Sequence, residues 1–344
     1  MRIIRLRAVQ PPTPGAPQDW RTQLGQVVVE VQTDDGLTGI GVGGGGAAGI
    51  HVIQTVLSDL LLGRDADNVE QLHREMCRQT SFYGRGGLVV MAISGVDLAL
   101  WDLRAKRAET PIAKLLNPDV DLAARIPTYA TVFDDVATRQ AIDAGHAAVK
   151  LHVERFGNRP NPTDVADLVR RVRDAIGAGG MMMIDAFARW DVDSTLRVAQ
   201  AVAEFDVRWI EEPVPPDRLD LYETLARECP VPIAGGEHEY LAAGFRELID
   251  RRLHAFVQPD INWCGGLTTL IEIYKMAKQA GVIVCPHRGC EPYALHAIAA
   301  LEPEPLAESP RTWFTSVDGF PQIENGAIQL RDEPGFGVSV SEIF

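Results

Sequence analysis

The sequence predicts an α/β fold, a closed (β/α)8 barrel of the TIM type preceded by a small α+β domain, and three observations predict it. Eight short apolar runs follow one another between residues 126 and 308, amphipathic helices separate them, and an antiparallel meander precedes them. Runs this continuously apolar are typical of a parallel sheet that is covered on both faces. Eight β-then-α units favour a barrel over an open, doubly wound sheet.

Residues 1–120 are expected to form the α+β domain. The runs at residues 3–9, 26–33 and 37–42 have the pattern of strands, and Asp34-Asp35-Gly36 is typical of the hairpin turn between the last two. The apolar face of residues 89–106 predicts a long helix. The prolines at positions 111 and 118 interrupt the pattern, so we place the domain boundary near residue 120.

Residues 121–310 are assigned to the barrel, and residues 311–344 to a turn-rich C-terminal tail that packs back on the N-terminal domain. The eight apolar runs cover residues 126–131, 147–153, 181–185, 207–211, 231–237, 255–260, 281–287 and 305–308. Amphipathic patterns predict helices between them, such as residues 164–176 and 267–280. A doubly wound sheet would also need a glycine-rich phosphate turn after its first strand. The glycines at positions 43–46 are not followed by Lys-Ser/Thr and predict a flexible loop.

Composition excludes several classes of partner. The chain has 344 residues, with 47 acidic against 33 basic side chains and a formal charge of −14. An acidic surface repels nucleic-acid phosphates and anionic lipid head groups, so neither nucleic acid nor a membrane is expected as a partner. No apolar run approaches the roughly 18 residues that a membrane helix needs. The five scattered cysteines are typical of reduced thiols, and we expect a cytoplasmic protein.

Three carboxylates end consecutive apolar runs: Asp185, Glu211 and Glu237, each 26 residues from the next. The carboxyl ends of barrel strands meet at the catalytic mouth, so these side chains should converge. Crowded carboxylates need a cation, and hard oxygen ligands select Mg²⁺. The alternative is that each acid caps the next helix, which explains one such residue better than three in the same register.

Other polar residues also end these runs. Asp260 and His287 end the sixth and seventh runs and predict a dyad that can take or give a proton. Lys150 and His152 are two residues apart, so both should face the lumen near the metal. Glu308 ends the eighth run, where it could hold a polar substrate group or, if protonated, donate to an oxyanion. Each of these residues also has a plainer explanation. His287 could be a hydrogen-bonded structural histidine, and Lys150 and His152 could lie at a solvated edge of the sheet. Glu308 could cap a helix.

Several motifs together resemble the enolase superfamily, and within it the mandelate racemase subgroup. They are the helix segment from Ser94 to Lys106, Trp209-Ile-Glu-Glu-Pro213, Gly236-Glu237 and Gln258-Pro-Asp260. The resemblance implies that the N-terminal domain and the tail cap the barrel and supply specificity loops, which we expect at residues 11–20 and 43–49. It also implies homo-oligomers, dimers or octamers. The implied site residues are the Mg²⁺ ligands Asp185, Glu211 and Glu237, the dyad of Asp260 and His287, and the eighth-strand acid Glu308.

Further motifs resemble the acid-sugar dehydratases of the L-rhamnonate type: Gly236-Glu-His238, the segment from Gln258 to Thr269, and Pro334-Gly-Phe-Gly-Val338. Two features depart from these relatives. The second strand carries Lys150-Leu-His152 in place of Lys-x-Lys, and Arg-Gly-Cys-Glu follows His287 in place of Gly-Ser-Ser. The second base is therefore left open, and so is the identity of the sugar acid.

The resemblance implies a Mg²⁺-dependent hydro-lyase that converts a sugar acid, through an enediolate, into a 2-keto-3-deoxy acid. The metal and Lys150 would bind the substrate carboxylate, and His287 or His152 would take the α-proton. Two alternatives stay open. One is a racemase or epimerase of a hydroxy acid, which needs a base on each face. The other is a non-catalytic barrel that binds a metal or a metabolite.

Overall fold

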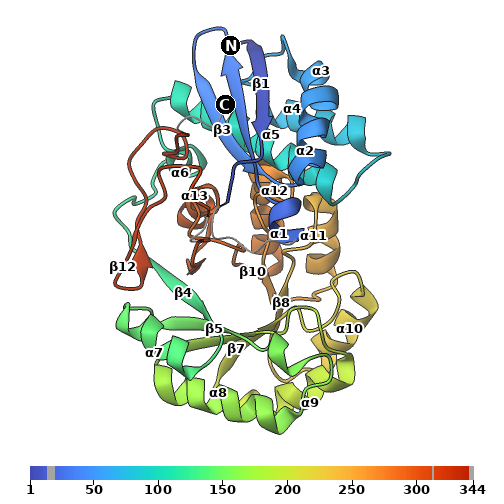
Figure 1. Cartoon of the computed structure of the whole chain (residues 1–344), viewed down its shortest axis with the longest axis vertical. Coiled ribbons are helices and arrows are strands. Elements are labelled where there is room, and N and C mark those ends of the chain that lie inside the picture. The colour runs from blue at the N-terminus through green and yellow to red at the C-terminus, as the bar shows by residue number, and fades with distance from the viewer. Residues whose placement is uncertain (14–19, 312–313, 341–344) are drawn as a thin grey trace.

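The computed structural model describes residues 1–13, 20–311 and 314–340. It confirms the predicted fold class, with a three-stranded antiparallel sheet at the N-terminus and a parallel barrel sheet below it in Figure 1. Within the described residues, no helix combines the length and the apolar character needed to cross a membrane. The division into domains at residues 120 and 310 stays a prediction.

The N-terminal sheet has the order β1-β2-β3. Its elements and the helices that follow are β1 (Ile3–Val9), α1 (Trp20–Gln23), β2 (Val27–Thr33), β3 (Thr38–Gly43), α2 (Gly46–Val52), a π-helical turn (Ile53–Leu57), α3 (Ser58–Leu61), α4 (Val69–Thr80), α5 (Leu88–Arg107) and α6 (Ile112–Leu116). Helix α5 lies against β3 so closely that a Cβ at Gly41 would stand 2.0 Å from the Gly95 carbonyl oxygen. Glycine at this position therefore permits the contact between helix and sheet.

Eight parallel strands form the barrel sheet, and successive strands pair from β4 to β10. They are β4 (Ile126–Val132), β5 (Ala148–His152), β6 (Met181–Asp185), β7 (Val207–Glu211), β8 (Ile233–Gly235), β9 (Phe256–Val257), β10 (Ile283–Val284) and β11 (Ala307–Glu308). The last strand, β11, pairs with the first, β4. Beside β10, the Cys285 thiol donates to the Leu306 carbonyl at 3.6 Å, which places the seventh strand next to the eighth.

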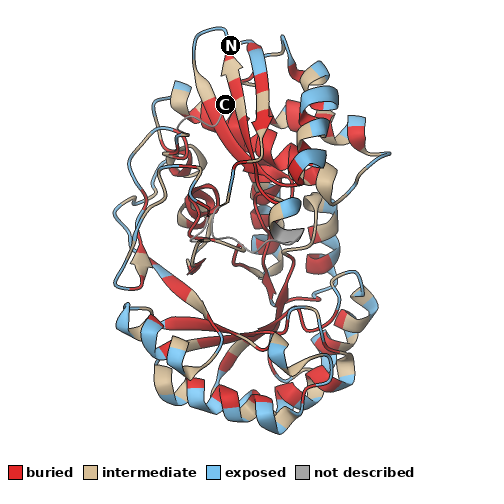
Figure 2. Cartoon of the chain, viewed as in Figure 1, coloured by how far each residue is buried: buried red, intermediate tan, exposed pale blue. Residues whose placement is uncertain are grey.

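The barrel helices alternate with the strands and cover the outside of the sheet, with their buried faces inward (Figure 2). They are α7 (Asp135–Asp143), α8 (Pro162–Ile176), α9 (Val192–Val202), α10 (Leu219–Glu228), α11 (Leu241–Asp250), α12 (Gly266–Ala280) and α13 (Pro292–Leu301), with 3-10 turns at Glu154–Phe156 and Ala203–Phe205. Side chains cap several N-termini. Asp134 accepts from the Ala137 amide and Asp191 from the Ser194 amide, both at 2.8 Å.

The barrel interior is filled by one buried residue from each strand or its immediate flank. These residues form a single cluster: Tyr129, Ala148, Met183, Trp209, Ala234, Phe256, Cys285 and Leu306. Such a layer is the packed core of a barrel rather than a pore. It also fixes the register of the polar residues above it.

The C-terminal tail contacts two parts of the chain, the barrel and the N-terminal helices. Strands β12 (Ile323–Glu324) and β13 (Ala327–Ile328) form a hairpin, and β13 pairs with β4 of the barrel. Farther along, the Gly335 carbonyl accepts from Ile112 and the Phe336 amide donates to Asp102 of α5. The tail therefore contacts the barrel as well as the N-terminal helices.

Candidate active site

The polar residues of the site form the layer directly above the barrel core. A residue two positions farther along a strand faces the same side, so each core residue is followed by a second inward-facing residue. In this layer lie Lys150, Asp185, Glu211, Gln258, His287 and Glu308. The predicted acids Glu237 and Asp260 lie beyond the ends of β8 and β9, because those strands are shorter than the apolar runs suggested.

Lys150 is the buried cation of this layer. Its Nζ lies 2.6 Å from Glu211 Oε1, 2.8 Å from Glu308 Oε1 and 3.4 Å from Asp185 Oδ2. Burial opposes the charge, but the carboxylates outweigh it and raise the lysine pKa well above its usual value. Lys150 is therefore buried directly above the core layer of the barrel.

Glu211 accepts from three side chains. Its Oε2 accepts from Trp209 Nε1 at 3.1 Å and from Gln258 Nε2 at 2.7 Å. Burial, helped by the neighbouring carboxylates, raises the pKa of Glu211 to about 8 although Lys150 opposes this. Gln258 belongs to a motif in the sequence, but its contact with Glu211 across two strands was not foreseen.

Glu308 is held as an anion. Burial raises its pKa, but Lys150 and His287 outweigh this and lower the pKa to about 2. Its Oε2 also accepts from the Arg288 amide at 2.9 Å, and its Oε1 accepts from Thr131 at 3.3 Å. Of the two roles considered for Glu308, these contacts favour an ionised acceptor over a protonated donor.

Asp260 and His287 lie together as the sequence predicts. His287 Nδ1 is 3.0 Å from Asp260 Oδ2, while Nε2 is 3.1 Å from Glu237 Oε2 and 3.8 Å from Glu308 Oε2. Burial opposes protonation of His287, but Glu237 and the bond to Asp260 outweigh it and raise the pKa. A neutral imidazole that donates from Nδ1 to Asp260 has a free electron pair on Nε2, which is the nitrogen of a general base.

Arg288 was not singled out from the sequence. Its Nη1 lies 3.1 Å from Asp260 Oδ2, and its guanidinium lies over the Trp263 ring, 4.9 Å from the centroid. Burial raises the pKa of Asp260, but Arg288 and His287 outweigh it and lower the pKa to about 2. The residue after His287, where the sequence departs from its relatives, thus helps to keep the dyad aspartate ionised.

His152 ends β5 and faces Asp185, with Nε2 3.0 Å from Oδ2. Burial opposes its protonation, but the bond to Asp185 and the charge of Asp185 raise the histidine pKa. The pKa of Asp185 is lowered in turn, since Lys150 and His152 outweigh burial. His152 therefore belongs to the same cluster as Lys150, on the side opposite the short strands β8–β10.

The carboxylates do not all meet at one point. Glu237 faces His238 and His287 instead of Asp185, and His238 Nδ1 is 2.9 Å from Glu212 Oε2. Among the described residues, Glu212, Glu237 and His238 each offer a ligand atom within 4.8 Å of the others. The set of Asp185, Glu211 and Glu237 is not drawn together in this way, so its role as the ligand set stays a prediction.

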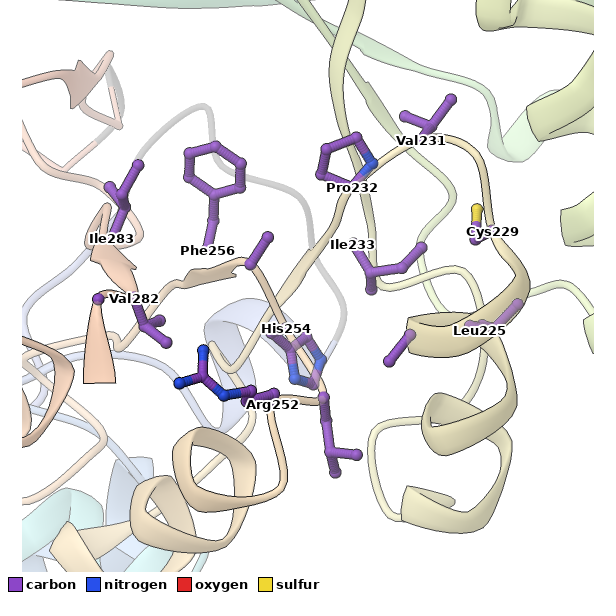
Figure 3. A pocket seen from close by; sticks show the side chains of 14 residues that line it. Leu225, Cys229, Val231, Pro232, Ile233, Arg252, His254, Phe256, Val282 and Ile283 are labelled. Carbon is purple, nitrogen blue, oxygen red and sulfur yellow. The ribbon is translucent and has the colours of Figure 1, made fainter.

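A pocket of about 500 Å³ opens at the other end of the barrel, where β8, β9 and β10 begin. Figure 3 shows Ile233, Phe256 and Ile283 around it, with Arg252 and His254 on one side. None of the candidate site residues lines it. Because the chemistry of such barrels belongs to the carboxyl ends of the strands, this pocket is not the candidate active site.

Comparison with known families agrees with this geometry. Residues 5–117 match the N-terminal domain model of mandelate racemase and muconate lactonizing enzyme, and residues 134–343 match the enolase C-terminal domain-like model. This chain belongs to the enolase superfamily. At the mouth of this barrel, Asp185 and Glu211 end neighbouring strands, and His287 lies beside Asp260.

Individual members of the superfamily are similar over nearly the whole chain. The L-rhamnonate dehydratase of Saccharopolyspora erythraea is 33% identical over 92% of this chain and 84% of its own length. The structure of 3,6-anhydro-D-galactonate cycloisomerase from Zobellia galactanivorans has a TM-score of 0.88, with 30% identity over 99% of this chain and 97% of its own. A racemase from Streptomyces coelicolor A3(2) with bound magnesium has a TM-score of 0.86, with 29% identity over 98% of this chain and 97% of its own. The similar proteins thus include three different reaction types.

Proposed function

We propose that this protein is a Mg²⁺-dependent hydro-lyase that removes water from a sugar acid of the aldonic type and yields a 2-keto-3-deoxy acid. The observation that carries the proposal is the position of His287. Asp260 orients its Nδ1, and its Nε2 faces the acids of the mouth beside Lys150 and Glu308. The similar L-rhamnonate dehydratase supports the reaction type.

The mouth suits a divalent cation of the hard type. It holds more carboxylates than permanent cations: Asp185, Glu211, Glu212, Glu237, Asp260 and Glu308 against Lys150 and Arg288. We propose Asp185, Glu211 and Glu237 as the Mg²⁺ ligands, and the similar racemase structure contains magnesium. When bound, the ion would acidify the α-proton of a substrate carboxylate and stabilise the charge that develops on it.

We assign the binding of the substrate and the proton transfers to side chains of this protein. Lys150 stays charged and binds the substrate carboxylate, and the ionised Glu308 accepts from substrate hydroxyl groups. His287 Nε2 or His152 takes the proton from the α-carbon. Protonated His287 then donates to the β-hydroxyl, the C3–O bond breaks, and water leaves. The resulting enol gains a proton at C3, loses the proton of its C2 hydroxyl group, and becomes the 2-keto-3-deoxy acid.

A racemase or epimerase is the second candidate. The observation in its favour is that His152 and His287 lie on different sides of the mouth, on β5 and after β10. If each can reach the α-carbon, both stereochemical directions are open. A His152→Gln variant would then lose α-proton exchange from one epimer only, whereas a dehydratase that relies on His287 would keep forming deoxy product.

Proton NMR in D₂O tests the proposal. The protein is incubated with Mg²⁺ and a panel of pentonic, hexonic and aldaric acids. We expect the α-proton signal to disappear as C3-deoxy signals emerge, and we expect His287→Asn to abolish both. The matched control is His51→Asn, an exposed histidine, which should react like wild type. Exchange without a deoxy product would establish the racemase or epimerase instead, and no change with any acid would refute both enzymes.

A further inference from the structure

Two partly exposed phenyl rings flank His152 at the mouth of the barrel. Phe133 follows β4 and Phe187 follows β6, so three adjacent strands contribute to this group. The ring centroid of His152 is 5.4 Å from that of Phe133 and 5.9 Å from that of Phe187. Phe133 is 52% exposed and Phe187 36%. We refer to Phe133 and Phe187 as the aromatic wall.

The backbone holds one half of this wall in an unusual conformation. Phe187 and Ala188 both have positive φ angles, 55° and 54°, which residues with a Cβ seldom adopt. The Phe187 amide donates to Asp185 Oδ1 at 2.9 Å, and the Ala188 amide donates to the Glu212 carbonyl at 2.6 Å. Strained backbone of this kind concentrates at functional sites. Here it orients a large apolar side chain beside a polar cluster.

The two ring nitrogens of His152 have different surroundings. Nε2 contacts Asp185, and the buried Nδ1 has no hydrogen-bond partner among the described residues. Asp185 in turn lies 3.4 Å from Lys150 Nζ, so His152 contacts both the aromatic wall and a carboxylate of the Lys150 cluster. A small molecule that binds here would therefore meet apolar rings as well as charged groups, which suit different chemistry in its two ends.

We infer that the aromatic wall is a specificity-determining element, which binds the distal, carbon-rich end of the sugar acid whose carboxylate Lys150 holds. This inference rests on the proposed function. Phenyl faces favour C–H groups, whereas placing a charged carboxylate against them costs desolvation free energy. The substrate class is therefore a monocarboxylic acid with a methyl or other unsubstituted carbon at its far end, and aldaric acids are disfavoured. Residues 14–19 of the expected specificity loop lie outside the described residues.

Binding to the His287→Asn variant of this chain tests the inference apart from catalysis. Calorimetry with Mg²⁺ compares three acids of one configuration that differ only in the distal group: methyl, hydroxymethyl or carboxylate. We expect the methyl acid to bind best and the diacid worst. Adding Phe187→Ala or Phe133→Ala should weaken the methyl acid about tenfold and leave the diacid nearly unchanged, since a lost apolar contact of this size costs 10-fold or more.

The control is Phe82→Ala in the same background, because Phe82 is 93% exposed and lies between α4 and α5, away from this part of the barrel. Equal weakening of all three acids by the wall variants would overturn the inference, as would a preference for the diacid or no binding of any acid. A shift in sedimentation with an unchanged order of affinities would identify the wall as a subunit contact and also overturn it. Binding in this order without turnover by wild type would instead refute only the dehydratase.

Discussion

Lys150 is the cation that the buried acids on its side of the mouth share. Replacing it with methionine leaves Asp185, Glu211 and Glu308 without their shared cation. Removing one partner of a buried ion pair costs about 3–5 kcal/mol, so we expect Lys150→Met to lower the free energy of unfolding by about that amount in metal-free buffer. Urea unfolding measures it, with and without Mg²⁺. We expect Mg²⁺ to recover part of the loss.

The matched control for Lys150 is Lys114→Met. Lys114 lies 3.3 Å from Asp332, and both side chains are well exposed. Exposed pairs contribute about 0–1 kcal/mol, so this variant should unfold almost like wild type. Equal effects of the two substitutions would contradict the assignment of Lys150 as the cation that balances the mouth.

His254 makes stability depend on pH. Burial lowers its pKa to about 3, while an unfolded chain binds this proton near pH 6.5. Between these values the unfolded state holds more protons, so the free energy of unfolding falls as the pH is lowered and falls no further below about pH 3. At pH 5 the loss relative to pH 7 is about 2 kcal/mol. Glu211 and His296 also titrate in this range, but they contribute equally to wild type and variant. Urea unfolding at both pH values should therefore show a change in His254→Asn that is about 2 kcal/mol less destabilising than in wild type.

The exposed His51 provides the comparison for His254, and His51→Asn should keep the full difference between pH 7 and pH 5. If His254→Asn kept it too, another group would be responsible. The acids Asp260 and Glu308 contribute little in this range, because their pKa values are near 2 and the stability they supply is lost only as the pH falls below about 5.

Individual site residues were predictable where they end an apolar run. That pattern identifies Asp185, Glu211 and Glu308, which are the last residues of their strands. Arg288 and Gln258 escaped it, since one follows a strand end and the other is an amide within a motif. Their contacts join Arg288 to Asp260 after neighbouring strands, and Gln258 to Glu211 across one intervening strand, so the pattern of strand-ending acids alone could not reveal them.

The N-terminus of helix α12 is capped by a side chain that belongs to another helix. Its own N-cap is Gly265, which has no side chain to accept from the first amides. Asp97 of α5 accepts instead, from the Thr268 amide at 3.0 Å and from the Thr268 hydroxyl at 2.6 Å. The amphipathic pattern predicted a helix that begins at residue 267, but the cap comes from 171 residues away. Periodicity carries no information on such a partner.

Asp97→Ala should therefore destabilise α12 and its contact with α5 together. Losing an N-cap lowers the free energy of unfolding by up to about 2 kcal/mol. We expect a loss near this upper limit, because the amides that lose their acceptor are buried. Urea unfolding measures the loss, and Asp97→Asn should recover part of it because the amide oxygen still accepts. Asp119→Ala removes an exposed aspartate outside any helix and should have almost no effect. An Asp97→Ala variant as stable as Asp119→Ala would contradict this capping.

The C-terminal tail contacts helix α5, and this contact links the end of the chain to the N-terminal domain. The buried Asp102 accepts from the Ile40 amide of β3 and from the Phe336 amide of the tail, at 2.8 and 3.0 Å, and pairs with Lys106. The sequence predicted that the tail returns to the N-terminal domain. It could not predict the hairpin that joins β4, because a two-residue strand such as β13 has no periodicity to detect.

Gly335 and Gly337 allow a matched test of this junction. Both have positive φ angles, 76° and 66°, so alanine strains the backbone at either position. A Cβ at Gly335 would lie 2.1 Å from Asp102 Oδ1, whereas a Cβ at Gly337 would meet nothing nearer than 3.5 Å. We expect Gly337→Ala to cost about 1 kcal/mol, the strain alone. Gly335→Ala should cost at least about 2 kcal/mol more, since it also displaces a buried carboxylate from its amide donors.

A double-mutant cycle with Asp102→Ala separates the clash from the strain. Removing the carboxylate leaves the added methyl group only the flexible Lys106 side chain as a close neighbour, with its Cγ at 3.2 Å, so Gly335→Ala should cost little more than Gly337→Ala in that background. Urea unfolding of the single and double variants measures the coupling. Additive losses at positions 102 and 335 would mean that the tail and α5 do not meet through this carboxylate.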